Sequence, residues 1–126
     1  MPELPPESKS LLLRHFDSVE SMEIAALLER SSTAYWTPQA ISQQLGIPLT
    51  VIDAKLVSLL DARLLVRGEQ TGAYRFAPAT EELGERMREL LRFYSEQRAV
   101  IINTIYSANL ERLRAFSNAF RLKKDS

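Results

Sequence analysis

The stretch "TPQAISQQLGIPLTVIDAKLVSLLDARLLVRGEQTGAYRFAP" (residues 37–78) carries the signals of two short helices joined by a tight turn and followed by a hairpin. Thr37 predicts a helix N-cap, and Pro38 suits the first helical position, where its missing N–H is not needed. We expect this helix to end near Leu45, because Gly46 readily takes the left-handed conformation that closes many helices. The chain is therefore predicted to turn sharply and begin a new helix.

The second helix of the stretch is predicted from about Leu49 to Arg63. Its apolar stripe has three- and four-residue spacing and consists of Ile52, Leu56, Leu59 and Leu60. The polar residues that we expect to face outward are Thr50, Asp53, Lys55, Ser58 and Asp61. Two short strands should follow around a turn at residues 68–72, with Tyr74 and Phe76 on one face and Arg75 on the other.

The residues before this stretch predict two more helices and a strand. "LPPESKSLLLRHF" (residues 4–16) indicates a short helix from about Glu7 to Phe16. Asp17 and Glu20 stand at capping-box spacing ahead of an apolar segment that we expect to be a largely buried helix. The aromatic "AYWT" (residues 34–37) is predicted to pair with the hairpin as a third strand.

The predicted order of elements resembles the winged helix-turn-helix proteins of bacterial regulators, especially the small MarR-type and ArsR-type repressors. The resemblance covers residues 17–106 and is carried by "TPQAISQQLGIP", "LVSLLDARLLV" and "VRGEQTGAYRFAP". The later "RFYSEQRAVIINTIYS" is similar to a segment of uncharacterised bacterial winged-helix proteins. Such proteins usually have glycine in a run like "ARGLV", whereas this chain has Leu64, so either the helix ends by another route or Leu64 is strained.

This resemblance implies a mostly α fold with a small β-hairpin wing and a long C-terminal dimerisation helix. The expected parts are an N-terminal arm with a short helix (residues 1–16), a winged helix-turn-helix domain (residues 17–78), and a dimerisation helix with a basic amphipathic tail (residues 79–126). It also implies a homodimeric, DNA-binding transcriptional regulator. The alternative function is a winged-helix module that binds another protein rather than DNA.

For DNA recognition, the helix from Leu49 would enter the major groove while the hairpin touches phosphates. Base contacts would then come from Thr50, Asp53, Lys55 and Ser58. Phosphate contacts would come from Thr37, Gln39, Gln43, Arg67 and Arg75. That helix has no arginine, asparagine or glutamine before Arg63, so it lacks the commonest side chains for pairing with guanine or adenine.

The distribution of charge weakens the case for DNA recognition. Sixteen basic and sixteen acidic residues cancel over the chain, so it lacks the positive field that is typical of nucleic-acid binders. Residues 17–79 hold five basic and seven acidic residues, whereas residues 80–126 hold nine basic and seven acidic ones. The predicted reading domain is therefore the more acidic part, and a partner protein is expected to bind either this domain or the tail.

Residues 79–108 predict a coiled-coil-like seam for dimerisation. Its expected contacts are Leu83, Met87, Leu90, Tyr94, Ile101 and Ile105. Gln97, Thr104 and Ala108 continue the same spacing, and Glu82–Arg86, Glu85–Arg88 and Glu89–Arg92 are spaced for ion pairs on the solvent side. The alternative is that the apolar "AVIINTIY" (residues 99–106) packs back onto its own subunit.

The tail "NLERLRAFSNAFRLKKDS" (residues 109–126) combines apolar residues at helical spacing with a basic composition. Three interpretations follow from that pattern. The tail is a final helix that docks on the dimer, a helix that binds a partner protein through Phe116 and Phe120, or a segment that attaches to a membrane surface or to DNA phosphates.

Other functions find little support in the sequence. There is no cysteine and one histidine, His15, so we expect no metal site and no ArsR-type metal sensing. No nucleophile motif or phosphate-binding glycine loop is present, so we expect neither an enzyme nor a cofactor. A ligand site lined by Tyr35, Trp36, Tyr94 and Tyr106 is the alternative to an ordinary aromatic core. No signal peptide or integral membrane segment is recognised, which predicts a cytoplasmic protein.

Overall fold

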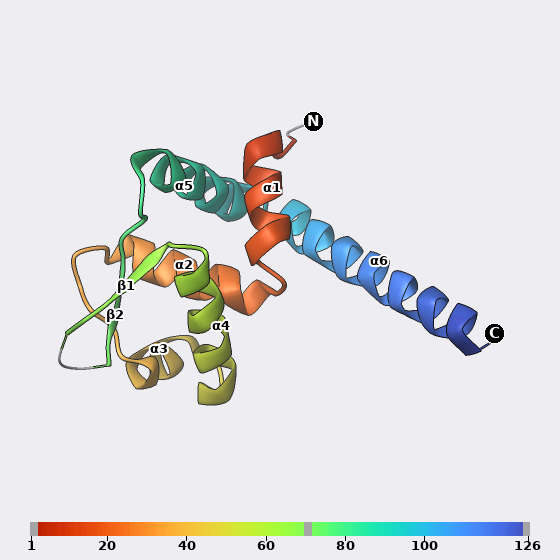
Figure 1. The fold of residues 1–126 in the computed structure, drawn as a ribbon. Coiled ribbons are helices and arrows are strands. Elements are labelled where there is room, and N and C mark those ends of the chain that lie inside the picture. The colour runs from red at the N-terminus through yellow and green to blue at the C-terminus, as the bar shows by residue number, and fades with distance from the viewer. Residues whose placement is uncertain (1–2, 70–71, 125–126) are drawn as a thin grey trace.

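The computed structural model describes residues 3–69 and 72–124 (Figure 1). Within these residues the chain forms six helices and one two-stranded antiparallel hairpin. The elements in order are α1 (Pro6–His15), α2 (Val19–Arg30), α3 (Pro38–Leu45), α4 (Leu49–Asp61), β1 (Leu65–Arg67), β2 (Tyr74–Phe76), α5 (Glu81–Glu96) and α6 (Arg98–Lys124). The predicted mostly α class with a small hairpin is confirmed.

The turn between α3 and α4 forms as its sequence predicts. The Thr37 side chain accepts a hydrogen bond from the Ala40 N–H at 3.1 Å and caps α3. Gly46 ends the helix in the left-handed region at φ 69°. The Ser42 hydroxyl then donates to the Ile47 carbonyl at 2.6 Å, which fastens the turn to the end of α3. Local signals alone are sufficient to shape this part of the chain.

The end of α4 differs from the prediction, because the helix stops at Asp61 and not at Arg63. Arg63 takes φ 62°, and its N–H donates to the Leu60 carbonyl at 2.9 Å. The Leu64 N–H donates to the Leu59 carbonyl at 3.1 Å, which completes a Schellman closure. The strain expected at Leu64 therefore lies one residue earlier, and Leu64 is free to be buried.

The hairpin pairs Leu65 with Phe76, Val66 with Arg75 and Arg67 with Tyr74. The predicted third strand is reduced to one isolated bridge between Trp36 and Tyr74. Its two backbone hydrogen bonds, at 2.7 and 2.8 Å, still tie the entry of α3 to β2. The tip of the predicted turn, residues 70 and 71, lies outside the described residues.

The core lies where α2 meets α4, α5 and the hairpin, and α1 covers α5 from another side. Leu28 and Ile52 are fully buried in it. The predicted capping box at Asp17 and Glu20 is wrong, because the Ser18 side chain caps α2 by accepting from the Ser21 N–H.

The single helix predicted for residues 79–108 is also wrong, because the chain forms two helices there. Gln97 interrupts them with φ −131° and ψ 56°. Its N–H donates to the Phe93 carbonyl at 2.7 Å, and its own carbonyl accepts from Val100 at 3.1 Å. Gln97 thus ends α5 and starts α6, which projects away from the body (Figure 1).

Replacing Arg63 by glycine should stabilise the protein. A left-handed conformation costs a residue with a Cβ roughly 1–2 kcal/mol, and glycine avoids this cost. Part of the gain is lost, because glycine also makes the unfolded chain more flexible. We expect Arg63→Gly to raise the free energy of unfolding by about 0.5–1 kcal/mol in urea melts followed by circular dichroism.

Arg67→Gly is the matched control, because Arg67 lies in a strand with negative φ. It should lower the free energy of unfolding. A decrease for Arg63→Gly as well would contradict the account of the α4 terminus.

Candidate binding surfaces

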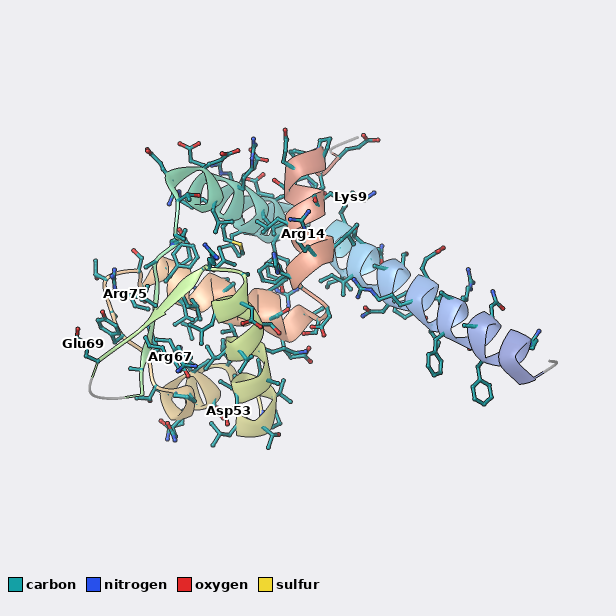
Figure 2. All side chains as sticks on the ribbon, viewed as in Figure 1. Lys9, Arg14, Asp53, Arg67, Glu69 and Arg75 are labelled. Atoms are coloured by element: carbon teal, nitrogen blue, oxygen red, sulfur yellow. The ribbon has the colours of Figure 1, made fainter. Side chains whose placement is uncertain are left out.

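The outward face of α4 is the predicted base-reading surface, and it is acidic and apolar. Its exposed residues include Thr50, Asp53, Val57 and Asp61. The Val57 side chain is 56% exposed, and Leu49 at the start of the helix is 40% exposed. Figure 2 shows Asp53 at the end of the body opposite α5. We call this set of residues the α4 face; it carries two carboxylates and no cation.

Lys55, the only basic residue of α4, does not belong to the α4 face, which corrects its predicted outward position. Its ammonium lies 2.9 Å from the Asp17 carboxylate in the α1–α2 connection, and only 18% of its side chain is exposed. Burial opposes ionisation of Asp17, but the hydrogen bond and charge of Lys55 outweigh it, so the pKa of Asp17 is lowered. Ser58 is half-buried, with its hydroxyl 3.5 Å from the Ala54 carbonyl.

The predicted phosphate contacts are dispersed. Gln39 and Gln43 are exposed on α3, whereas the Thr37 hydroxyl is engaged in capping. Arg67 and Arg75 occupy alternate positions of the paired strands, so their side chains leave opposite faces of the hairpin. Figure 2 labels both arginines. Arg75 is half-buried, and its guanidinium lies 5.5 Å from the centre of the Tyr35 ring.

The predicted dimer seam is used inside the chain. Met87, Leu90 and Ile101 are 0% exposed, and Tyr94 and Ile105 are each 4% exposed. Leu83 is partly buried and packs against the same core. α1 and α2 contact this side of α5, so the residues of the seam pack within their own subunit, as the alternative for residues 99–106 proposed for that segment. A second copy has no access to them while this packing holds.

None of the three ion pairs predicted within α5 is found among the described residues, and two of their members contact α1 instead. Arg86 lies 3.6 Å from Glu7, and the Ser8 hydroxyl donates to Glu89 at 2.6 Å. Ser8 is 0% exposed, so this hydrogen bond is sheltered from water. Arg86 and Glu89 of α5 therefore help to hold α1 in place.

The second half of α6 forms the other candidate surface. All residues from Glu111 to Arg121 are exposed. Near the start of this half, Arg112 donates to the Leu13 carbonyl at 2.9 Å. Large apolar side chains line one side of the helix at seven-, three- and four-residue spacing, and we call them the tail stripe: Tyr106 (67% exposed), Leu113 (60%), Phe116 (69%) and Phe120 (60%).

The tail stripe is unusual because each of its large apolar side chains is at least 60% exposed. Burying one such side chain contributes roughly 1.5–3 kcal/mol, so leaving several of them in water on one helix forfeits a large stabilisation. Arg114 and Arg121 are exposed on the same part of α6. A helix with an apolar stripe and basic neighbours is suited to lie in an apolar groove with acidic edges.

The aromatic residues considered for a ligand site do not meet. Tyr35 is 51% exposed near the hairpin, whereas Trp36 bridges to Tyr74. Tyr106 belongs to the tail stripe, and Tyr94 alone of the four lines the cavity between α2 and α5. The aromatic ligand site is therefore not assembled as the sequence suggested.

His15 and metal sites add no further candidate. His15 is half-buried on α1, and burial, together with Arg14, lowers its pKa. Over residues 3–69 and 72–124, no group of three or more His, Asp or Glu side chains is placed to hold a metal ion. In the same ranges, no helix is both long and apolar enough to cross a membrane.

Comparison with known proteins finds no matching family model, no similar curated protein and no similar solved structure. The α4 face and the tail stripe are therefore the features from which a function can be proposed.

The difference between core and tail stripe can be measured directly. The double variant Leu113→Ser plus Phe116→Ser should change the free energy of unfolding of the body by less than about 1 kcal/mol, because exposed residues contribute little to folding. Ile101→Ala, on the buried part of the same helix, should lower it by about 2–5 kcal/mol. Urea denaturation followed by tyrosine and tryptophan fluorescence provides the comparison. Equal losses for both variants would show that the tail packs on the body.

Proposed function

We propose that this chain is a winged helix-turn-helix module that acts by binding another protein through the tail stripe of α6. The observation that carries the proposal is the exposure of Leu113, Phe116 and Phe120, at 60%, 69% and 60%, on a helix that projects from the body. A helix in this position presents its anchors without any rearrangement of the core.

The winged-helix assignment rests on the order and connection of the elements. α3 and α4 are joined through the left-handed Gly46, and an antiparallel hairpin follows α4. The Trp36–Tyr74 bridge adds the short strand that precedes α3 in this fold. α2 packs beneath α3 and α4 as the third helix of the unit.

The partner is best described by the chemistry of the tail. An apolar groove would cover the tail stripe, and carboxylates at its edge would pair with Arg114 and Arg121. A second tail of this chain is a poor match, because it would place these arginines near one another, and Glu111 is the only acidic residue between 106 and 121. A different protein with an acidic groove fits better.

The acidic α4 face also favours a protein partner over DNA. Asp53 and Asp61 would bring negative charge toward DNA phosphates, and Lys55, the one basic residue of α4, is paired with Asp17. Most of the affinity for DNA comes from phosphate neutralisation, so an acidic reading face weakens binding. The winged-helix unit then serves as a scaffold for α6 and as a second surface for protein contact.

DNA-binding transcription regulation remains the second candidate function. It is favoured by the hairpin that follows α4, where Arg67 is exposed, and by Gln39 and Gln43, which are exposed on α3. A regulator built this way would need phosphate contacts from the hairpin and a second subunit that associates through residues other than the predicted seam.

Partner binding is tested by affinity capture from cells that express the tagged chain, followed by reconstitution with the captured protein after purification. Leu113→Ser plus Phe116→Ser should weaken binding of the purified partner at least about tenfold, since apolar anchors at interfaces contribute about 2 kcal/mol or more each. Ala115→Ser plus Ala119→Ser is the matched control on other sides of the same helix and should bind like the wild type.

Two outcomes would contradict the proposal. One is an equal loss of partner binding in both double variants. The other is the absence of any captured protein together with stripe-dependent sedimentation on vesicles of anionic lipid, which would assign the tail to a membrane surface.

DNA binding is tested by fluorescence anisotropy with labelled duplexes that tile the region upstream of the coding sequence, at about 50 and 200 mM salt. Weak binding without preference for any duplex is expected, because of the acidic α4 face. Saturable, salt-sensitive binding that prefers one duplex and is lost in Arg67→Ala would instead establish the regulator.

A further inference from the structure

A cavity of about 510 Å³ lies between α2 and α5 and is separate from the tail stripe. This volume falls within the range of sites that bind small molecules. Its lining includes Arg30 from α2, Arg88 and Arg92 from α5, and Arg98 from the first turn of α6. Four arginines from three helices therefore border one cavity, and the Arg88 guanidinium lies over Gly84 beside it.

Three of these four arginines make no ion pair with any described residue. Arg98 is the exception, because it lies 2.8 Å from Glu23 and its guanidinium stands 5.0 Å from the centre of the Tyr94 ring. Arg88 and Arg92 were expected to pair with Glu85 and Glu89. No such pair is found in the described part of the chain, and Glu89 accepts from Ser8 instead.

The charge of the lining is consequently unbalanced. Glu23 and Glu29 are the acidic residues among the cavity's described lining, and Glu23 is engaged by Arg98. An excess of guanidinium groups around one cavity favours an anion, and guanidinium binds the oxygens of phosphate or carboxylate in pairs.

Tyr94 provides an independent indication. It is 4% exposed, and no acceptor among the described residues meets full hydrogen-bond geometry with its hydroxyl, although the Glu23 carboxylate interacts with it. Burial, and then the charge of Glu23, raise the pKa of Tyr94 to about 12, so the hydroxyl keeps its proton at neutral pH. A buried donor without a well-placed acceptor is unfavourable, and an anion in the cavity would supply one.

We propose that this cavity binds a small oxyanion that carries an apolar group. Arg30, Arg88 and Arg92 hold the phosphate or carboxylate oxygens, while Leu91 and Ala26 contact the apolar part. Because the lining comes from both α2 and α5, a bound anion also links the helix-turn-helix unit to the base of α6.

The test is isothermal titration calorimetry of the full chain with phenyl phosphate, inorganic phosphate and benzoate at constant ionic strength. Phenyl phosphate should bind more tightly than inorganic phosphate, because only the former contacts Leu91 and Ala26. Arg88→Gln plus Arg92→Gln should lower the affinity for phenyl phosphate at least about tenfold, the equivalent of one lost charge-assisted hydrogen bond.

Arg114→Gln plus Arg121→Gln removes the same charge from the exposed half of α6 and serves as the control. It should leave the affinity within about twofold of the wild type, since distant surface charges are largely screened. Tyr94→Phe keeps the ring and removes the hydroxyl, and it should weaken phenyl phosphate binding several-fold.

The proposal is overturned if none of the three probes binds saturably, or if both arginine double variants lose affinity equally, which would indicate nonspecific attraction. Unchanged affinity in Tyr94→Phe would show that the hydroxyl does not contact the bound anion, against the proposed site. All variants are compared by circular dichroism, and the arginine pairs are on exposed positions whose replacement should leave the fold intact.

Discussion

The packing of α1 and α2 over the apolar side of α5 and the first turns of α6 is the interaction on which the rest of the molecule depends. It buries Met87, Leu90 and Ile101, and it places α2 where it can also support α4 and the hairpin. The break at Gln97 lets α5 and α6 both reach this core. Beyond this core, residues 111–121 of α6 are exposed.

The same packing separates the molecule into regions of different charge. Asp17, in the connection that α1 makes to α2, neutralises Lys55 and leaves the α4 face with its carboxylates. Arginines instead gather around the cavity between α2 and α5. The α4 face thus presents acidic and apolar side chains, whereas the arginines of the cavity lie on another side of the molecule. This distribution is the physical reason to favour a protein partner.

The tail stripe and the cavity are connected through the start of α6. Arg98 closes one side of the cavity, and the helix that begins there carries the tail stripe outward. Arg112 donates to the Leu13 carbonyl in α1 and Asn109 to the Asp17 carbonyl in the α1–α2 connection, so they hold the middle of α6 against these residues. Binding of an anion between α2 and α5 would therefore be coupled to the position of α6, the helix that carries the tail stripe.

The sequence by itself determined the features that depend on neighbouring residues. Thr37, Pro38 and Gly46 set the limits of α3, and the apolar spacing of Ile52, Leu56 and Leu59 fixed the buried side of α4, because caps, turns and helical periodicity are local properties. The helical spacing of Phe116 and Phe120 was also visible in the sequence, but it left open whether the tail would be covered or exposed.

Only the tertiary structure decided which surface covers which. From the sequence alone, a stripe such as Met87, Leu90 and Tyr94 could pack against a second subunit or against the core of its own chain. It packs within the chain because α1 and α2 lie against it. The pairing of Lys55 with Asp17, the left-handed turn at Arg63 and the unpaired arginines of the cavity likewise depend on residues distant in sequence or on where the chain must go next. Periodicity shows that a face will be buried, whereas the identity of its partner is set by the packing of the whole chain.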